Sequence, residues 1–398
     1  MRALHLIKTV DGANWAVDQV TQLVRLGIEV HVVLPKLDGR FMDDWLRSGA
    51  IIHELVIDIP IKRPWQFIAT LKAIRALVAT INPDIIHSHF FTTTIAVRYA
   101  LGKSHPTPRV FQVPGPFHLE HIFFRLWELS TAGENDSWIA SSEYTYKLYQ
   151  SHGIKNERLF LSYYGNSHLD LPTKNSGIRE KYDINKNQFI VGNINYMYPP
   201  RIYLGHTKGI KRHEDVIDAL KKIIRSRSDV TGLIIGGQWG LGRSYEDKLK
   251  NRIHGINESK IIMTGRVPAI QAKCAWVDFD IAVHVPTSEN CGGVIEPLMA
   301  GVPVIAARTG GIPEVIIDGV TGVLVNAKDP EMLADAINRV LSDISSYREM
   351  AKDGQKLVKH MFDVKRTSLE INNIYKYLLI KNQDKPSSFK PREYISSL

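Results

Sequence analysis

The stretch Thr287–Ile305, TSENCGGVIEPLMAGVPVI, is the most informative part of the sequence. It lies between two short apolar runs that are long enough for buried strands. Gly301 ends any helix within it, and Pro297 is tolerated only in a first helical turn. The stretch therefore predicts a glycine loop and a short helix beginning near Gly293 or Val294, set between two strands of a parallel sheet.

The same alternation of apolar runs and helix-period segments continues on both sides of this stretch, and it predicts repeated βαβ units. In the first half the expected strands are Ala3–Ile7, Glu29–Leu34, Ile51–Ile57, Ile85–Ser88, Val110–Val113, Trp138–Ala140 and Arg158–Leu161. In the second half they are Phe189–Ile194, Gly232–Gly236, Lys260–Met263, Ile281–Val283, Val302–Ala306 and Gly322–Val325. We expect an α/β protein with two doubly wound, Rossmann-like domains.

A polar segment over residues 172–187, PTKNSGIREKYDINKN, separates the two halves and is typical of an interdomain linker. The expected first domain is therefore 1–171 and the second 188–362. The polar end of the chain, 381–398, is expected to be disordered. Ligand sites of such domains lie at the carboxyl ends of their strands.

Composition excludes several classes of protein. The 398 residues are 44% hydrophobic, and no apolar run is long enough for a membrane-spanning helix. Only Cys274 and Cys291 occur, so a disulfide framework is excluded and a reducing, cytoplasmic location is expected. The first ten residues lack a cleavage site and indicate a strand, not a signal peptide. The net charge of +9 favours an anionic partner, but no basic stripe with interleaved aromatics indicates nucleic acid.

The glycine loop has the features of an anion site. The N–H groups of a first helical turn have no partner within the helix and carry partial positive charge. Gly292 and Gly293 let a phosphate or diphosphate approach these groups closely. Glu289 and Glu296 bracket the loop, and carboxylates suit the vicinal hydroxyls of a ribose or a sugar ring.

Together with Thr309–Gly322, TGGIPEVIIDGVTG, this stretch resembles the donor-site signature of family 4 glycosyltransferases. The resemblance covers nearly the whole chain and implies the GT-B fold, with an acceptor-side and a donor-side domain facing across a cleft. It also implies a final helix, about 363–380, that packs back on the first domain. The implied reaction is a retaining, metal-independent transfer from a nucleotide-diphosphate sugar, with no other cofactor.

The resemblance assigns roles to the residues of the second domain. It implies that Glu296 binds the ribose and that Glu289 contacts the transferred sugar. Only six residues separate the two glutamates where seven are usual, so Ser288 remains a candidate for the first role. Gly292, Gly293 and Val294 would hold the diphosphate, and Glu314 would lie near the nucleotide.

A basic pair in the same family neutralises the diphosphate leaving group, because the transition state carries extra negative charge there. Lys211, in GIKRHEDVIDAL, resembles the lysine of this pair. The arginine expected just after Gly192 is replaced by Asn193. The following insert, YMYPPRIYLGHTK, offers Arg201 and Lys208 as substitutes.

In the first domain, the loop VDGANW at 10–15 resembles the glycine loop that lies beside the donor phosphate, and Gly12 fits it. His118, in VPGPFHLEH, falls where the family presents a histidine near the transferring sugar; the alternative is a structural role. His87 and His89 form an HSH motif. Their pattern suits a metal site, but flanking apolar residues favour a role in packing or in lining the cleft.

Several alternatives remain open. A nucleotide-sugar epimerase of the same fold and a catalytically silent nucleotide-sugar-binding scaffold compete with the transferase, whereas no G-x-G-x-x-G supports a dinucleotide oxidoreductase. The acceptor is expected to be a glycan or lipid-linked hydroxyl in cell-surface polysaccharide or glycolipid synthesis. The segment Ile61–Ile81 is either a membrane-surface helix or an ordinary helix with a basic outer face. The former would place the protein peripherally at the inner membrane face.

Overall fold

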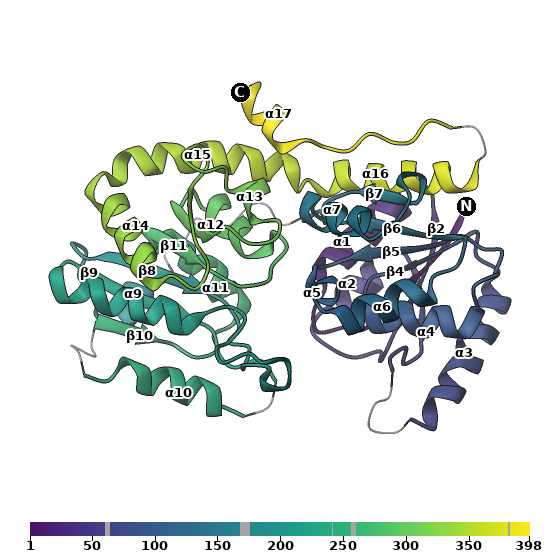
Figure 1. The fold of residues 1–398 in the computed structure, drawn as a ribbon, viewed down its shortest axis with the longest axis horizontal. Coiled ribbons are helices and arrows are strands. Elements are labelled where there is room, and N and C mark those ends of the chain that lie inside the picture. Colours follow the sequence, from purple (N-terminus) through teal and green to yellow (C-terminus); the bar gives the residue numbers. More distant parts are fainter. Residues whose placement is uncertain (60–63, 168–175, 241, 256–259, 381–382) are drawn as a thin grey trace. The chain divides into compact units, whose positions relative to one another are not determined.

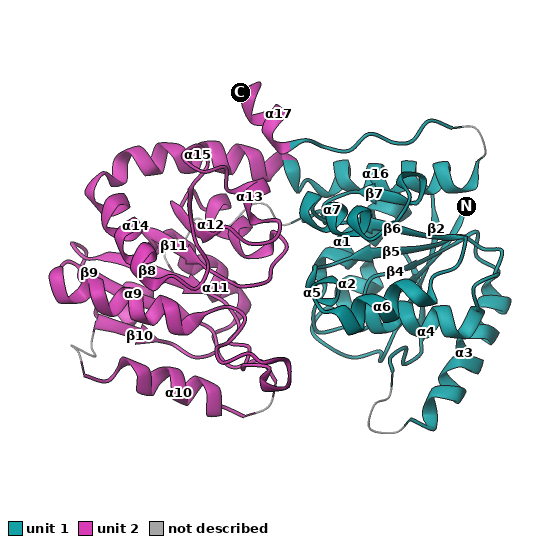
Figure 2. Ribbon diagram, viewed as in Figure 1, with its two compact units in different colours: residues 1–167, 361–390 teal, residues 168–360, 391–398 magenta. Residues whose placement is uncertain are grey.

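The computed structural model describes residues 1–59, 64–167, 176–240, 242–255, 260–380 and 383–398. The chain forms two compact units (Figures 1 and 2). Unit 1 comprises Met1–Ser167 and Met361–Lys390, and unit 2 comprises His168–His360 and Pro391–Leu398. In the part of the chain that is described, no helix combines the length and apolar character needed to cross a membrane.

Unit 1 is built on a seven-stranded parallel sheet in the order β3-β2-β1-β4-β5-β6-β7. Its strands are β1 (Arg2–Leu6), β2 (Glu29–Leu34), β3 (Ile51–Glu54), β4 (Ile85–Ser88), β5 (Arg109–Val113), β6 (Asp136–Ala140) and β7 (Leu159–Leu161). Its helices are α1 (Asn14–Arg25), α2 (Met42–Arg47), α3 (Gln66–Ile81), α4 (Phe91–Leu101), α5 (Phe117–Glu120), α6 (Ile122–Thr131), α7 (Glu143–Ser151), η1 (Asn156–Arg158) and α16 (Val364–Leu379). The strand order reverses between β1 and β4.

Unit 2 repeats this plan with a six-stranded parallel sheet in the order β10-β9-β8-β11-β12-β13. Its strands are β8 (Phe189–Ile194), β9 (Val230–Ile235), β10 (Ile261–Met263), β11 (Ile281–His284), β12 (Val304–Ala307) and β13 (Val323–Val325). Its helices are α8 (Ile178–Lys181), η2 (Ile202–Leu204), α9 (His213–Ser226), α10 (Ser244–Ile253), α11 (Ala269–Ala275), η4 (Trp276–Asp278), η5 (Gly292–Val294), α12 (Ile295–Met299), α13 (Ile312–Val315), α14 (Pro330–Ser342), α15 (Ile344–Met361) and α17 (Pro391–Ser396). Here the order reverses between β8 and β11.

The two sheets give each unit its own buried core. In unit 2 the apolar faces of α9 and α14 pack on the sheet strands, with Ile217, Leu220 and Ile337 fully buried. In unit 1, α16 packs against α1 and buries Ile371 and Tyr375 in the core. The C-terminal helix therefore belongs to the first unit although it follows the second in sequence.

Two segments differ from expectation. Residues 172–175 of the expected linker lie outside the described residues, but the rest of it packs as part of unit 2, because Ile178 and Ile184 are buried and Arg179 pairs with Asp280 at 3.4 Å. The tail is not wholly disordered: α17 packs against α13, and the ring of Tyr394 stacks on His360 at 4.5 Å.

Candidate functional site

The predicted glycine loop lies at the carboxyl edge of the second sheet, beside the reversal of strand order between β8 and β11. β11 ends at His284, the loop runs to Cys291, and a 3₁₀ turn (η5, from Gly292) leads into α12. The regular helix thus begins at Ile295, slightly later than expected. Pro297 occupies its first turn, where no N–H is needed.

Three polar side chains from separate elements meet at this edge. The Lys211 ammonium, just before α9, donates to Oε2 of Glu289 in the loop. The same oxygen lies 3.2 Å from Nε2 of His284, at the end of β11. Asn195, after β8, lies 3.4 Å from the other ring nitrogen of His284. We call Lys211, Glu289 and His284 the edge cluster.

The charges of the edge cluster follow from its burial. Burial alone would raise the pKa of Glu289, but Lys211 and His284 more than offset this, so its pKa is lowered and it stays ionised. Burial lowers the pKa of His284, and Lys211 adds to this effect, so the imidazole is neutral near pH 7. A neutral His284 has one N–H to donate, and Glu289 Oε2 accepts it. The cluster is thus one cation, one anion and one neutral donor.

Two glycines are required for this geometry. A Cβ on Gly293 would lie 2.1 Å from ring atoms of His284. Gly310 has φ +56°, and a Cβ there would meet the backbone oxygen of Glu289. Gly292, in contrast, has nothing within 4 Å of a built Cβ. Gly293 and Gly310 are therefore needed for packing within the site, whereas Gly292 borders open space.

The second half of the signature lies beside the loop. The Gly311 N–H approaches the Glu289 carbonyl at 3.4 Å, and the Cys291 thiol points to the Gly311 carbonyl at 3.4 Å. Burial raises the pKa of Cys291, and the nearby Glu314 carboxylate adds to this. Glu314 on α13 is thus close to the glycine loop, and Cys291 fills space beneath it. The side chain of Val294 is also buried.

Glu296 lies in the first turn of α12 and is half-buried. Its Oε2 accepts a hydrogen bond from the indole Nε1 of Trp276 at 3.3 Å. The other carboxylate oxygen remains available to a ligand hydroxyl. Trp276, in η4, is itself buried and fixes the rotamer of Glu296.

The basic residues of the insert have different surroundings. Lys208 donates to Asp215 at 2.6 Å, and Arg212 contacts the other oxygen of the same carboxylate at 2.5 Å. Asn193, at the position where the resemblance expects an arginine, is buried within β8 and supplies no cation. Burial raises the pKa of Tyr198, the Glu289 carboxylate raises it further and the Arg201 guanidinium lowers it, so both charges lie near Tyr198.

In unit 1, Gly12 lies in the loop between β1 and α1, where Ala13 adopts a left-handed conformation (φ 60°) before the helix begins. The other candidate of the first unit, His118, lies on α5. Its ring is buried against Phe91 and Phe111, and Nε2 lies 3.1 Å from the Tyr149 hydroxyl. Burial lowers the pKa of His118 to about 4, which supports a structural role.

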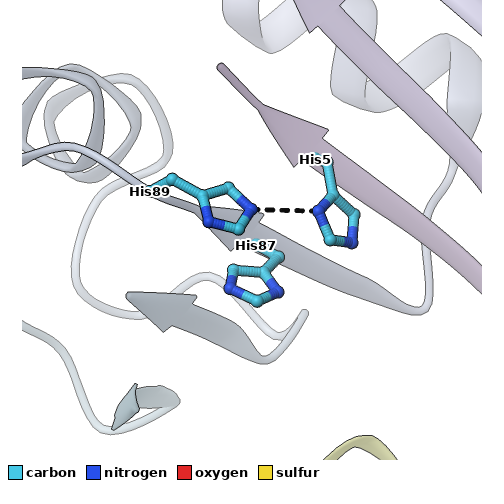
Figure 3. A group of neighbouring side chains, drawn as sticks. All are labelled: His5, His87 and His89. Carbon is cyan, nitrogen blue, oxygen red and sulfur yellow. Dashed lines mark hydrogen bonds between the residues drawn. The ribbon is translucent and has the colours of Figure 1, made fainter. Parts of the chain in front are cut away.

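His5, His87 and His89 lie together at the reversal of strand order in unit 1 (Figure 3). Their ligand atoms fall within 4.8 Å of one another, and this is the one group with metal-binding spacing among the described residues. Burial lowers the pKa of all three well below 6.5, to about 3 for His5, so the rings are neutral.

Their hydrogen bonds form one directional chain. The Tyr164 hydroxyl donates to the Gln112 carbonyl, so it must accept from His89 Nδ1. His89 Nε2 then accepts from His5 Nδ1 at 3.0 Å, and His5 Nε2 accepts from the Tyr375 hydroxyl at 3.0 Å. Tyr375 in turn accepts from His87 Nδ1.

This order fixes every tautomer and leaves His87 Nε2 as a buried acceptor with the Gln112 side chain nearby. A metal would have to replace the His5–His89 bond. The chain instead joins α16 to β1 and β4, which favours the packing interpretation of the HSH motif.

The sequence analysis did not identify His284 or Tyr198 as site residues. His284 ends an apolar strand directly before the glycine loop, and a polar residue at this position is the sequence feature that indicates a site residue. Tyr198 lies in the insert after β8, whose arginine and lysine were the predicted site residues. The proximity of His284 and Tyr198 to Glu289 depends on how the chain folds after β8 and β11, which no local pattern records.

Two family models match the chain: Glycosyltransferase Family 4 over residues 12–165, and Glycosyl transferases group 1 over residues 185–357. The first match lies within unit 1 and the second within unit 2. The chain's two parallel sheets and its likeness to solved structures show the GT-B fold. The chain belongs to glycosyltransferase family 4.

Named relatives match over part of their length. A D-inositol 3-phosphate glycosyltransferase of Frankia alni is 30% identical over 147 residues, 35% of this chain and 36% of the relative. An N-acetyl-alpha-D-glucosaminyl L-malate synthase of Bacillus anthracis is 28% identical over 175 residues, 44% of each chain. The crystal structure of Anabaena HepE in complex with UDP-glucose has a TM-score of 0.75 at 20% identity, covering 94% of this chain and 98% of that one. This chain thus spans less than half the length of these two curated relatives.

Proposed function

We propose that the protein transfers a sugar from a nucleotide-diphosphate sugar to a hydroxyl of a glycan or lipid-linked acceptor, with retention at the anomeric carbon. The observation that carries the proposal is the edge cluster, which places one ammonium and one ionised carboxylate beside an open glycine at the carboxyl edge of the second sheet. Membership of family 4 supports a sugar nucleotide as donor. The UDP-glucose bound by Anabaena HepE makes a uridine nucleotide the first donor to test.

Lys211 is the proposed diphosphate-binding cation. Without a ligand its charge is neutralised by Glu289, which therefore keeps the lysine at the site. A diphosphate at Gly292 would share this ammonium. When the glycosidic bond breaks, negative charge grows on the diphosphate, and a fixed cation stabilises that state more than the ground state. Arg201 is the proposed second cation.

Glu289 is the proposed contact to the transferred sugar. Because it remains ionised, it accepts hydrogen bonds from sugar hydroxyls and orients the ring. The Glu289 carboxylate joins the edge cluster through its contacts with Lys211 and His284, and this favours Glu289 over Ser288 for the role. Glu296, held by Trp276, is the proposed ribose contact, with Gly293, Val294 and Glu314 shaping the nucleotide site.

Retention is proposed to proceed by attack on the same face from which the diphosphate leaves, with the departing phosphate accepting the proton of the acceptor hydroxyl. This scheme needs orientation and cationic stabilisation, which the edge cluster supplies, and it needs neither a protein nucleophile nor a metal ion. Gly12 is proposed to border the donor phosphate from the first unit. The cluster of unit 1 histidines takes no part.

A cell-surface polysaccharide or glycolipid is the proposed product, with the protein acting at the cytoplasmic face of a membrane. The test is incubation of the protein with sugar nucleotides and an extract of cell-envelope glycans and lipids. Transfer to the extract supports the proposal. Isomerisation of the donor without an acceptor would identify an epimerase, and donor binding without turnover would identify a scaffold.

A further inference from the structure

We infer that the outer face of helices α3, α4 and α6 docks unit 1 on an anionic lipid bilayer. This inference deepens the proposed function, on which it rests for the lipid-linked acceptor. The face is defined by six exposed apolar and aromatic side chains: Trp65, Ile68, Tyr99, Ile122, Phe123 and Leu126. We call them the apolar face.

The exposure of these side chains is large for residues of their kind. It ranges from 44% for Tyr99 to 70% for Trp65. On α3 the exposed positions Trp65, Ile68 and Lys72 follow helical spacing, while Ile74 and Val78 on the opposite side are buried. Thus α3 has a conventional inner face and an outer face that also carries apolar groups.

The apolar face is continuous across the three helices, which lie side by side on one side of the sheet (Figure 1). The ring of Phe67 on α3 contacts that of Tyr99 on α4 edge-on, with centroids 5.9 Å apart. The Tyr99 hydroxyl accepts from the Trp127 indole of α6 at 2.9 Å. Trp127 contacts Phe123, with centroids 5.7 Å apart. Exposed apolar patches that span several elements are typical of interaction sites.

Charge identifies the partner. The three helices, all within the described residues, contain a single acidic residue, Glu128, which is fully buried and paired with Arg98 at 2.6 Å. Their exposed charges are basic, with Lys72 and Arg75 on α3. Aliphatic side chains, Trp and Tyr rings and exclusively positive exposed charge together match the interface of an anionic membrane. A protein partner would more often be met by charges of both signs.

The test is sedimentation of the full chain with vesicles of phosphatidylcholine alone or of phosphatidylcholine and phosphatidylglycerol in equal parts. We expect binding to the anionic vesicles only, weakened by salt. The variant Ile122→Ser/Phe123→Ser/Leu126→Ser should lose about tenfold or more in vesicle affinity, because the inserted apolar area is removed. Leu46→Ser/Ile270→Ser, which alters equally exposed residues elsewhere, should bind as the wild type does.

A second comparison isolates the charge. Lys72→Glu should weaken binding to anionic vesicles, whereas Lys359→Glu, at an exposed position of α15, should not. Nucleotide binding, measured on the same samples, should be unchanged in all four variants, so a failed donor site and a failed membrane face give different results. Absence of vesicle binding by the wild type would overturn the inference. Equal vesicle binding by the wild type and the triple variant would also overturn it. A dimer formed by the wild type but not by the triple variant would overturn it as well, because the apolar face would then be a dimer interface.

Discussion

The ammonium group of Lys211 lies against the carboxylate of Glu289 and joins the start of α9 to the loop after β11. Both side chains are largely buried, and His284 holds the same carboxylate oxygen from the end of β11. This ion pair lies where the strand order reverses, which is the position at which open α/β sheets bind their ligands. Each partner should therefore matter to stability as well as to turnover.

Lys211→Met should lower the free energy of unfolding by about 2 kcal/mol, because it leaves the Glu289 charge buried without its cation. Glu289→Gln in the same background should recover most of this loss. Urea denaturation of the two single variants and the double variant measures the coupling. Additive losses in the double variant would show that the two charges do not stabilise one another.

The same pair should depend on pH in a defined direction. The pKa of Glu289 is lowered in the folded protein relative to its ordinary 4.5, so its contribution to stability is present above about pH 4.5 and is lost as pH falls further. The difference in unfolding free energy between wild type and Glu289→Gln should therefore shrink below pH 4.5. A difference that grew in acid would contradict the ion pair.

Gly293→Ala should destabilise unit 2 by about 1–3 kcal/mol and reduce turnover, because the added methyl overlaps the His284 ring and the site cannot relax without moving it. Gly292→Ala is the matched control, since its methyl would meet no atom within 4 Å. It should keep the wild-type melting temperature. Equal melting temperatures for both variants would show that the His284 ring is not fixed against Gly293.

Much of the fold could be predicted from the sequence because period-2 and period-3.6 patterns are local. The strands Glu29–Leu34, Ile85–Ser88 and Phe189–Ile194 were predicted with the bounds observed. Helix α4 was not predicted, since its run of threonines favours extended structure and its burial on nearly all sides removes the amphipathic pattern.

The final helix, expected over about 363–380, is α16 (Val364–Leu379). It begins there because the Asp363 carboxylate accepts from the Lys365 and Arg366 N–H groups.

The site was predictable only in part. Glu289 and Lys211 could be identified separately, because each lies in a motif whose chemistry is local. The contact between these two residues, which lie 78 positions apart in the chain, could not be predicted from the sequence. The participation of His284 could not be predicted either. His118 shows the converse limit: its neighbours in sequence suggested a site, whereas its neighbours in space are Phe91, Phe111 and Tyr149.

Glu296→Ala should abolish most of the thermal stabilisation given by the donor nucleotide, because it removes the carboxylate proposed to bind the ribose hydroxyls. A loss of about tenfold in nucleotide affinity corresponds to one or two hydrogen bonds to a charged acceptor. Glu349→Ala, at a surface position on α15, serves as the control. Equal stabilisation of the wild type and Glu296→Ala would contradict the assignment.

The histidine cluster of unit 1 should make the protein sensitive to mild acid. His5, His87 and His89 are neutral in the fold with a lowered pKa, whereas an unfolded histidine titrates near 6.5. Below that pH the unfolded chain binds more protons, so stability should fall by up to about 1.4 kcal/mol per pH unit for each ring. Urea denaturation between pH 7 and pH 5 measures this fall.

The hydrogen-bond chain also predicts that Tyr375→Phe lowers stability by about 2 kcal/mol, since two buried ring nitrogens lose their partner. Purified protein should contain less than stoichiometric transition metal. A stoichiometric metal that is lost together with His5 would show that the three rings are ligands instead.

Calorimetric titration of the wild type, Lys211→Met and Glu289→Gln with a panel of nucleoside diphosphates, beginning with UDP, measures directly whether Lys211 binds the diphosphate. The edge cluster predicts that one nucleotide binds the wild type, that Lys211→Met weakens this binding by about tenfold or more, and that Glu289→Gln retains it. Equal affinity of the wild type and Lys211→Met for that nucleotide would contradict the placement of the diphosphate at Lys211.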